Sequence, residues 1–160
     1  MFRRLSLLLT LSLGLTGCGF SPALAPDASG RVAGTYTVAD PKSAAEFRFA
    51  RALRAHLPGD GMTGPRLSYQ ISIGEAGTTD TRINVVGRVD FVAERADGGA
   101  PLRGSVQNFV SYSDFDSLTT AHSVEVSKED AYARLSEVLA QMVWHRLLAL
   151  EAQVKAKPGL

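Results

Sequence analysis

Polar and apolar residues alternate along the central part of the chain, and such alternation is typical of strands that bury one face. The alternating segments are residues 66–73, 82–94 and 102–113, with a shorter one at 35–39. The third is the weakest, because Phe109 lies on the opposite side from Val106 and Val110. Polar stretches at 74–80 and 96–101, the latter with Asp97-Gly98, are expected to form turns. The pattern therefore predicts a three-stranded antiparallel meander with one apolar face.

Apolar residues recur at helical spacing before this meander. Asp40 followed by Pro41 is typical of a helix start, so a first helix is expected from residue 40 to about residue 57. A proline and glycine turn at residues 58–61 would end this helix. Its apolar stripe consists of Phe47, Ala50, Leu53 and Leu57.

A second, longer helix is expected after the meander, from Ser127 to about Val154. Ser127 followed by Asp130 resembles a capping box closed by aspartate, and residues 114–126 show no period and are expected to form a loop. The apolar side of this helix consists of Tyr132, Leu135, Leu139, Met142, Leu147, Leu150 and Val154. Trp144 is interpreted as a core residue or an interface anchor.

The order strand, helix, three strands, helix predicts an α+β fold with two layers. Two helices would cover one face of a four-stranded, mostly antiparallel sheet. The first strand must pair across a helix, so it is expected to run parallel to one neighbour. The predicted domain covers residues 35–155, and residues 156–160 form a C-terminal tail.

The N-terminal residues follow a different pattern. Arg3 and Arg4 precede an apolar run at residues 5–15, which is shorter than the roughly 20 residues that a membrane-spanning helix needs. A basic start, a short apolar run and small residues after it are typical of a secretory signal peptide. Residues 1–17 are therefore predicted to be removed.

The sequence Leu15-Thr16-Gly17-Cys18 resembles the lipobox of bacterial lipoproteins. In such proteins the cysteine thiol takes a diacylglyceryl group, a peptidase cuts before the cysteine, and the freed amine takes a palmitoyl chain. Cys18 is thus the predicted lipidation site, an N-palmitoyl, S-diacylglycerol cysteine, and several acyl chains give stable anchoring. The alternative is a free cysteine after an ordinary signal peptide. Residues 18–34 would form a lead-in, and Gly19, which is not acidic, favours export to the outer membrane.

Charge and cysteine content exclude several classes of protein. Loss of residues 1–17 leaves fifteen basic and sixteen acidic side chains, a net charge of −1, which argues against a nucleic-acid binder. Cys18 is the only cysteine, so the chain cannot form an internal disulfide or a cysteine-cluster metal site.

Candidate catalytic chemistry is sparse. His56, His122 and His145 have no second ligand at metal spacing, and no nucleophile elbow or glycine-rich phosphate loop occurs. The pair Asp114 and Asp116 is interpreted as loop solvation. The sequence therefore predicts a non-enzymatic protein without metal or cofactor.

The first predicted helix also carries Arg48, Arg51 and Arg54 at a spacing of three residues. They could form an anion-binding stripe, although a solvated helix face is the favoured interpretation.

Taken in order, these features resemble the LptE family, the outer-membrane lipoproteins of lipopolysaccharide assembly. The matching segments are Gly17-Cys18-Gly19-Phe20, the arginine-rich first helix, Arg88-Val89-Asp90-Phe91-Val92, Ser111-Tyr112-Ser113 and Glu129-Asp130-Ala131-Tyr132-Ala133-Arg134-Leu135. The resemblance implies a two-layer α+β plug inside the LptD β-barrel translocon, one that helps the barrel assemble and binds lipopolysaccharide during delivery to the outer leaflet.

In relatives, basic residues in loops near one end of the sheet contact lipopolysaccharide. The loop at 74–81 lacks basic residues here, so the resemblance leaves Arg82 at its edge and Lys128 after the other long loop as candidates for lipid A phosphates. For both, plain surface solubility is the alternative.

Two other functions stay open. The chain could be an auxiliary lipoprotein of another envelope complex, such as a lipid ABC transporter or a cell-wall synthase. A periplasmic hydrolase is the third hypothesis, and it would need a nucleophile or metal that the sequence does not offer.

Overall fold

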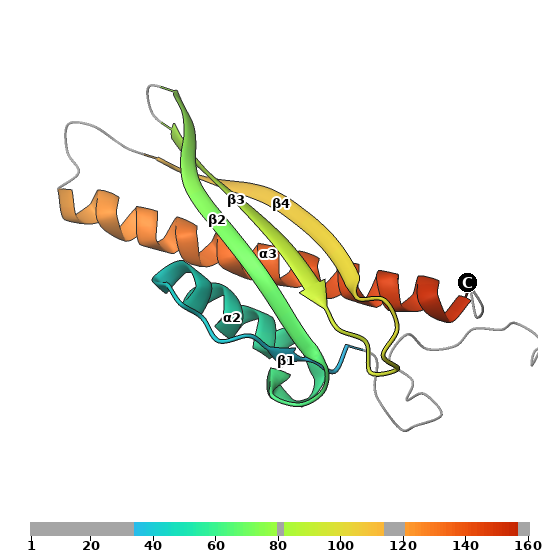
Figure 1. Cartoon of the computed structure of the whole chain (residues 1–160). Coiled ribbons are helices and arrows are strands. Elements are labelled where there is room, and N and C mark those ends of the chain that lie inside the picture. Colours follow the sequence, from blue (N-terminus) through green and yellow to red (C-terminus); the bar gives the residue numbers. More distant parts are fainter. Residues whose placement is uncertain (1–33, 80–81, 114–120, 157–160) are drawn as a thin grey trace, which may run out of the picture.

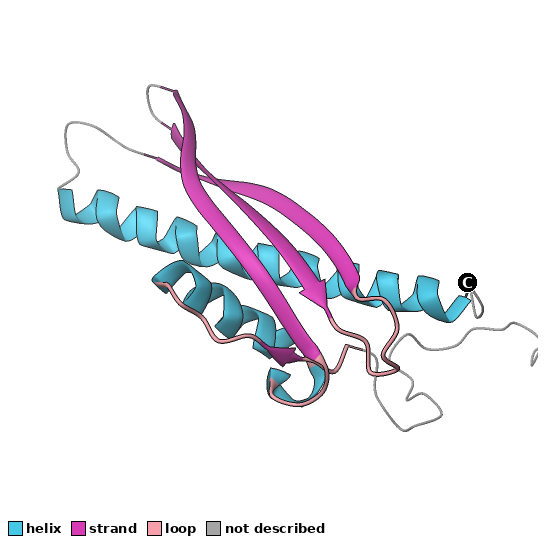
Figure 2. Cartoon of the chain, in the orientation of Figure 1, coloured by secondary structure: helices cyan, strands magenta, loops and turns pink. Residues whose placement is uncertain are grey.

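The computed structural model describes residues 34–79, 82–113 and 121–156. It confirms the predicted fold class and element order (Figures 1 and 2). The strands are β1 (Thr37–Val38), β2 (Arg66–Thr79), β3 (Arg82–Ala93) and β4 (Leu102–Ser113). The helices are α2 (Ala44–His56), the short 3-10 helix η2 (Pro58–Gly61) and α3 (Ala121–Ala156).

The four strands form one sheet in chain order, β1-β2-β3-β4. β2, β3 and β4 are antiparallel neighbours, which confirms the predicted meander. β1 runs parallel to β2 through the pairs Thr37–Arg66 and Val38–Leu67, because the chain crosses over through α2 before it returns to the sheet.

Both helices lie behind the same face of the sheet, and the other face is turned to solvent (Figure 1). Side chains that point toward the helices are apolar and buried, such as Leu67, Val89 and Phe91. Their neighbours along each strand, such as Arg88 and Asp90, are exposed. The period of two in the sequence therefore corresponds to the two faces of the sheet.

The core lies between the sheet and the two helices. Phe49 on α2 packs against Tyr69 on β2 with ring centroids 5.0 Å apart. On β3, a Cβ atom added at Gly87 would lie 2.7 Å from the Leu139 side chain, so α3 packs closely on the backbone of β3 at this glycine. The largest fully buried side chains are Tyr36, Phe49, Phe91, Leu53, Leu67, Leu135, Leu139, Leu147, Val85, Val89, Val143 and Ser136.

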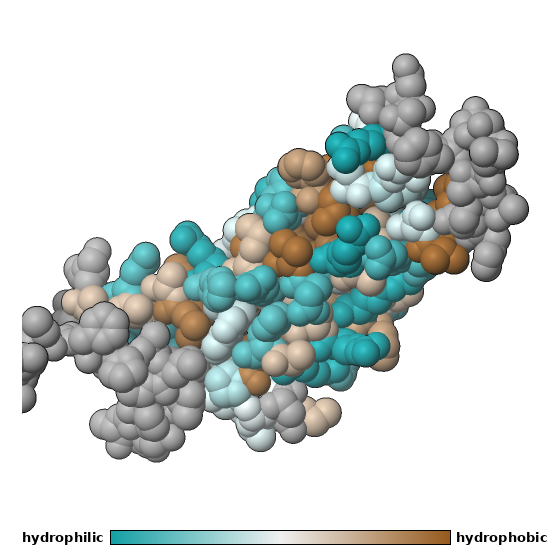
Figure 3. Space-filling view, turned by 180° about the vertical axis from the view of Figure 1, so that it is seen from behind, coloured by the Kyte–Doolittle hydropathy of each residue, from teal (hydrophilic) through white to brown (hydrophobic). Residues whose placement is uncertain are grey.

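The two helices run side by side in the same direction. Arg48 on α2 forms an ion pair with Glu129 on α3, and Nε2 of His56 on α2 lies 2.9 Å from Oε1 of Glu137 on α3. The partners are eight residues apart on each helix. Seen from behind, opposite to the view of Figure 1, the surface shows small groups of hydrophobic residues among hydrophilic ones (Figure 3).

The start and the apolar face of the first helix differ from the prediction. α2 begins at Ala44, and its N-cap is Ser43, whose hydroxyl accepts the Glu46 N–H. Asp40 is therefore not the cap. Phe47 is 60% exposed, whereas Phe49 is fully buried, because both positions satisfy a helical repeat and the sheet contacts the side of α2 that carries Phe49.

Two other boundaries were wrong. β2 continues to Thr79 through the segment expected to be a turn, with a bulge between Glu75 and Thr78 and a left-handed Gly77. α3 begins at Ala121, so Ser127 lies inside the helix and is not its cap. Val124, expected in a loop, packs against the core from this added helical turn.

Candidate functional site

The predicted lipidation site, Cys18, lies outside the described residues and stays a prediction. Gly34 is the first described residue, at the end of the expected lead-in. Its backbone N–H donates to both carboxylate oxygens of Glu151 on α3, at 3.2 and 3.3 Å. The point where the lead-in joins the domain is therefore fixed to the C-terminal part of α3.

Glu151 is the centre of this contact. Glu151 is only 6% exposed, and the Tyr36 hydroxyl donates to its Oε1 at 2.5 Å. A buried carboxylate needs such donors, because removal from water is costly for a charge. Glu151 joins two residues more than 110 positions earlier in the sequence.

The indole ring of Trp144 packs against Gly34. Gly34 has a φ of +80°, and a Cβ atom there would lie 1.9 Å from the indole ring. Only glycine combines this backbone conformation with this approach. Local patterns did not identify Gly34, Tyr36 and Glu151, although a glutamate four residues after Leu147 and three before Val154, and so on the apolar side of the helix, was a signal.

Lys128, one of the two predicted lipopolysaccharide contacts, is already partnered. Its ammonium lies 2.9 Å from Glu75 on β2, and the Tyr112 hydroxyl donates to the same carboxylate at 3.2 Å. The hydrogen bond from Lys128 lowers the pKa of Glu75, and Glu75 in turn raises the pKa of Lys128. The three side chains tie α3 to β2 and β4.

Arg82, the other predicted contact, lies on β3 opposite Ser113 and Thr79. It is exposed, and it has no ion-pair partner among the described residues. Strand alternation places its side chain on the helix-free face of the sheet, whereas Lys128 bonds to Glu75 from the helix side. The structure therefore does not bring the two predicted residues together.

The three arginines of α2 also do not form one stripe. Arg48 is paired with Glu129, whereas Arg51 is exposed. Arg54 is more enclosed and lies 4.0 Å from Asp40. The favoured interpretation as a solvated face fits Arg51 alone.

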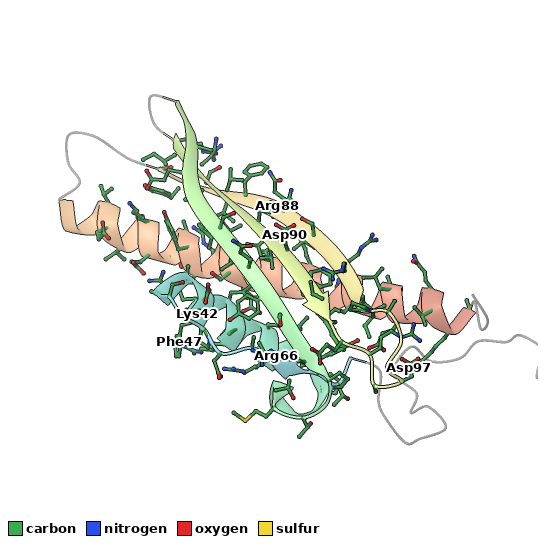
Figure 4. The ribbon with its side chains drawn as sticks, in the orientation of Figure 1. Lys42, Phe47, Arg66, Arg88, Asp90 and Asp97 are labelled. Carbon is green, nitrogen blue, oxygen red and sulfur yellow. The ribbon has the colours of Figure 1, made fainter. Side chains whose placement is uncertain are left out.

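The helix-free face of the sheet is mostly polar, although Val86, Val92 and Phe109 also lie on it. Arg88 and Asp90 lie next to each other on β3 (Figure 4) and form a bidentate pair at 2.8 and 3.0 Å. The hydrogen bond from Arg88, with a second from Ser105, lowers the pKa of Asp90. A shallow hollow on this face is lined by residues of β2, β3 and β4, among them Ser68, Gln70, Asp90, Val92, Arg103 and Ser105.

Within the described ranges, no three histidine, aspartate, glutamate or cysteine side chains gather in a way that could hold a metal ion. None of the described helices is both long and apolar enough to cross a bilayer.

Comparison with known proteins supports the fold. No family model and no curated protein matches the chain. Among solved structures, the chain is similar to a proposed lipoprotein of Caulobacter crescentus, with a TM-score of 0.60 and 17% identity over 74% of this chain and 92% of that one. It is also similar to a minor lipoprotein of Acinetobacter baumannii, with a TM-score of 0.53 and 17% identity over 75% and 94% of the two chains. This fold therefore occurs in bacterial lipoproteins.

Proposed function

We propose that this chain is a non-enzymatic lipoprotein of the outer membrane that serves as plug and assembly partner of a large LptD-like β-barrel. In this role it delivers lipopolysaccharide to the outer leaflet and contacts it directly. The observation that carries the proposal is the lipobox at Cys18 in front of a domain whose fold occurs in two bacterial lipoproteins.

The first described residue, Gly34, and the tips of β2 and β3 lie at opposite ends of the elongated domain. Gly34 is held near the C-terminal part of α3 by Glu151, and the tips of β2 and β3 lie at the opposite end of the domain (Figure 1). α3 has 36 residues, which corresponds to a length of about 54 Å. Arg82, the first residue of β3, therefore lies at the end of the domain opposite Gly34.

Charge at that far end favours Arg82 over Lys128 as a phosphate contact. Arg82 is exposed and has no acidic partner among the described residues, so its guanidinium can bind a phosphate bidentately. Lys128 would first have to leave Glu75.

Lipidation is tested by removing the thiol of Cys18. The Cys18→Ser variant should fold but lose detergent partitioning and membrane attachment, since the acyl chains are absent. Ser21→Ala, which leaves the lipobox intact, is the matched control. Membrane attachment of Cys18→Ser at the level of this control would contradict the anchor.

The barrel is tested by co-purification of the lipidated chain from detergent-solubilised envelopes, with mass spectrometry of the partner. A one-to-one complex with a large β-barrel, and loss of barrel maturation on depletion of the chain, is the expected result. A lipid ABC transporter or a cell-wall synthase as the stable partner would replace this proposal with the alternative function.

The lipopolysaccharide contact is tested on the purified complex. Arg82→Ala should weaken binding of lipopolysaccharide about tenfold, because one charge-assisted bidentate contact is lost. Arg51→Ala removes an exposed arginine from α2 and is the matched control. Equal binding by both variants would exclude Arg82 as a contact.

A further inference from the structure

β4 is an edge strand without the features that usually protect one. All twelve of its residues pair with β3 in a continuous register, from Leu102–Ala93 to Ser113–Arg82, with no bulge. It contains no proline, and Arg103 is its only charged residue. Edge strands are normally short, bulged, charged or covered, because their free backbone groups can pair with another chain.

The opposite edge of the sheet is protected at its two ends. β1 pairs with the start of β2 at Arg66 and Leu67, and a bulge between Glu75 and Thr78 interrupts the other end of β2. No strand of the described part of the chain pairs with the outer side of β4 (Figure 1). β4 is therefore the edge strand that is regular and unpaired along its whole length among the described residues.

Side-chain contacts identify the backbone groups that face outward. The Phe109 N–H donates to Oδ1 of Asn108 at 2.8 Å, so it points away from β3. Every second residue of an antiparallel strand has the same orientation, which places the N–H and C=O groups of Ser105, Gln107 and Ser111 on the outer side. The side-chain bond between Ser111 and Asn84, at 2.6 Å, agrees, because side chains approach closest where backbone bonds are not exchanged.

We infer that the β4 edge binds an extended segment of the partner protein as a fifth strand. Backbone hydrogen bonds would supply affinity, and alternate side chains would supply specificity. Phe109 is 61% exposed beside the edge, which fits an apolar residue on the added strand. Arg103 is exposed and has no ion pair among the described residues, which fits an acidic residue opposite it. The partner is the barrel of the proposed function, so the inference rests on that proposal.

A second copy of this chain fits the edge less well. Either of the two longest antiparallel registers between two β4 strands places Arg103 opposite a serine, Ser111 or Ser113. Phe109 would then lie opposite Ser105 or Gln107. Neither arrangement supplies the acidic and apolar residues that the edge favours.

Proline substitution tests the edge without changing the β3–β4 ladder. Gln107→Pro removes an N–H that points outward, and proline is tolerated at such positions of edge strands. Gln107→Thr keeps the N–H and a strand-forming residue, and it is the matched control. In a titration of the purified barrel, Gln107→Pro should raise the Kd about tenfold or more, and Gln107→Thr should leave it nearly unchanged.

Hydrogen exchange on the wild-type chain gives a second readout that does not depend on the fold of a variant. The amides of Ser105, Gln107 and Ser111 should exchange rapidly in the isolated chain and become protected in the barrel complex. Protection already present in the isolated chain would show that another part of this chain covers the edge. A dimer that Gln107→Pro abolishes would assign the edge to a second copy. Either result would overturn the inference.

The two proposals fail differently. If a barrel complex forms but the β4 amides stay unprotected and Gln107→Pro binds like Gln107→Thr, the edge inference is wrong and the proposed function stands. If the edge becomes protected by a partner that is not a barrel, strand addition stands and the proposed function is wrong. A chain that binds no partner contradicts both.

Discussion

Replacing Gly34 with alanine tests the contact that fixes the tether to the domain. The new Cβ would lie 1.9 Å from the Trp144 ring, far inside van der Waals contact, so either the ring or the segment at residues 34–36 must move. Movement of the segment breaks the Gly34 bond to Glu151. The Tyr36 bond to the same carboxylate would be weakened as well.

The expected loss can be estimated from two contributions. A Cβ at the left-handed φ of +80° costs about 1 kcal/mol. Loss of a hydrogen bond to a charged group costs about 1.5–3 kcal/mol. The free energy of unfolding of Gly34→Ala should therefore fall by about 2.5–4 kcal/mol, summed from the same contributions.

The chain offers its own probe for this experiment. Trp144 is the only tryptophan, so its emission should shift to longer wavelength when the segment at residues 34–36 no longer covers it. Urea unfolding followed by this fluorescence and by circular dichroism gives the stability change. Gly98→Ala is the matched control, because Gly98 has a φ of +71° but nothing within 4 Å of an added Cβ. If Gly34→Ala loses no more stability than Gly98→Ala and leaves the emission unchanged, the reasoning is refuted.

Two further predictions concern the sheet. Gly104→Ala places a Cβ 2.4 Å from the Phe91 ring and should lower the free energy of unfolding by about 1–3 kcal/mol in urea. Gly74→Ala, with open space around its Cβ, is the control and should not lower it. Equal stability of the two variants would contradict the tight packing at Gly104. The Glu75 pKa lies below its ordinary value of 4.5 because of Lys128, so the pair stabilises the folded state above that value and is lost as the pH falls through the lowered pKa. Lys128→Met should flatten this acid dependence in pH-dependent unfolding, and an unchanged profile would show that the pair contributes nothing.

Much of the fold could be predicted because it depends on local repeats. Alternation specified β3 and β4 to within one residue, since a one-residue shift would turn every buried side chain to solvent. The order of elements then favoured a sheet covered by two helices. The same local reasoning failed for Phe47 and Phe49, because both fit a helical repeat and only the neighbouring sheet selects between them.

The candidate site was harder to predict than the fold. Lys128 and Arg82 were both predicted as lipopolysaccharide contacts because they lie near two loops. The sheet separates them, however, and Lys128 forms an ion pair with Glu75. The sequence contained the acidic residue without indicating that strand β2 would continue far enough to present it. A polar segment can form a strand when its neighbour supplies the hydrogen bonds.

The sequence by itself predicted the lipobox and determined the alternation of the strands and the apolar side of the long helix, because each depends on residues close together along the chain. Only the tertiary structure decided that Gly34, Tyr36 and Glu151 meet, and that β4 is an outer strand whose free side no described strand pairs with. Contacts between residues more than 110 positions apart depend on how whole elements pack. No local pattern encodes that packing, because each partner is also compatible with a surface position on its own.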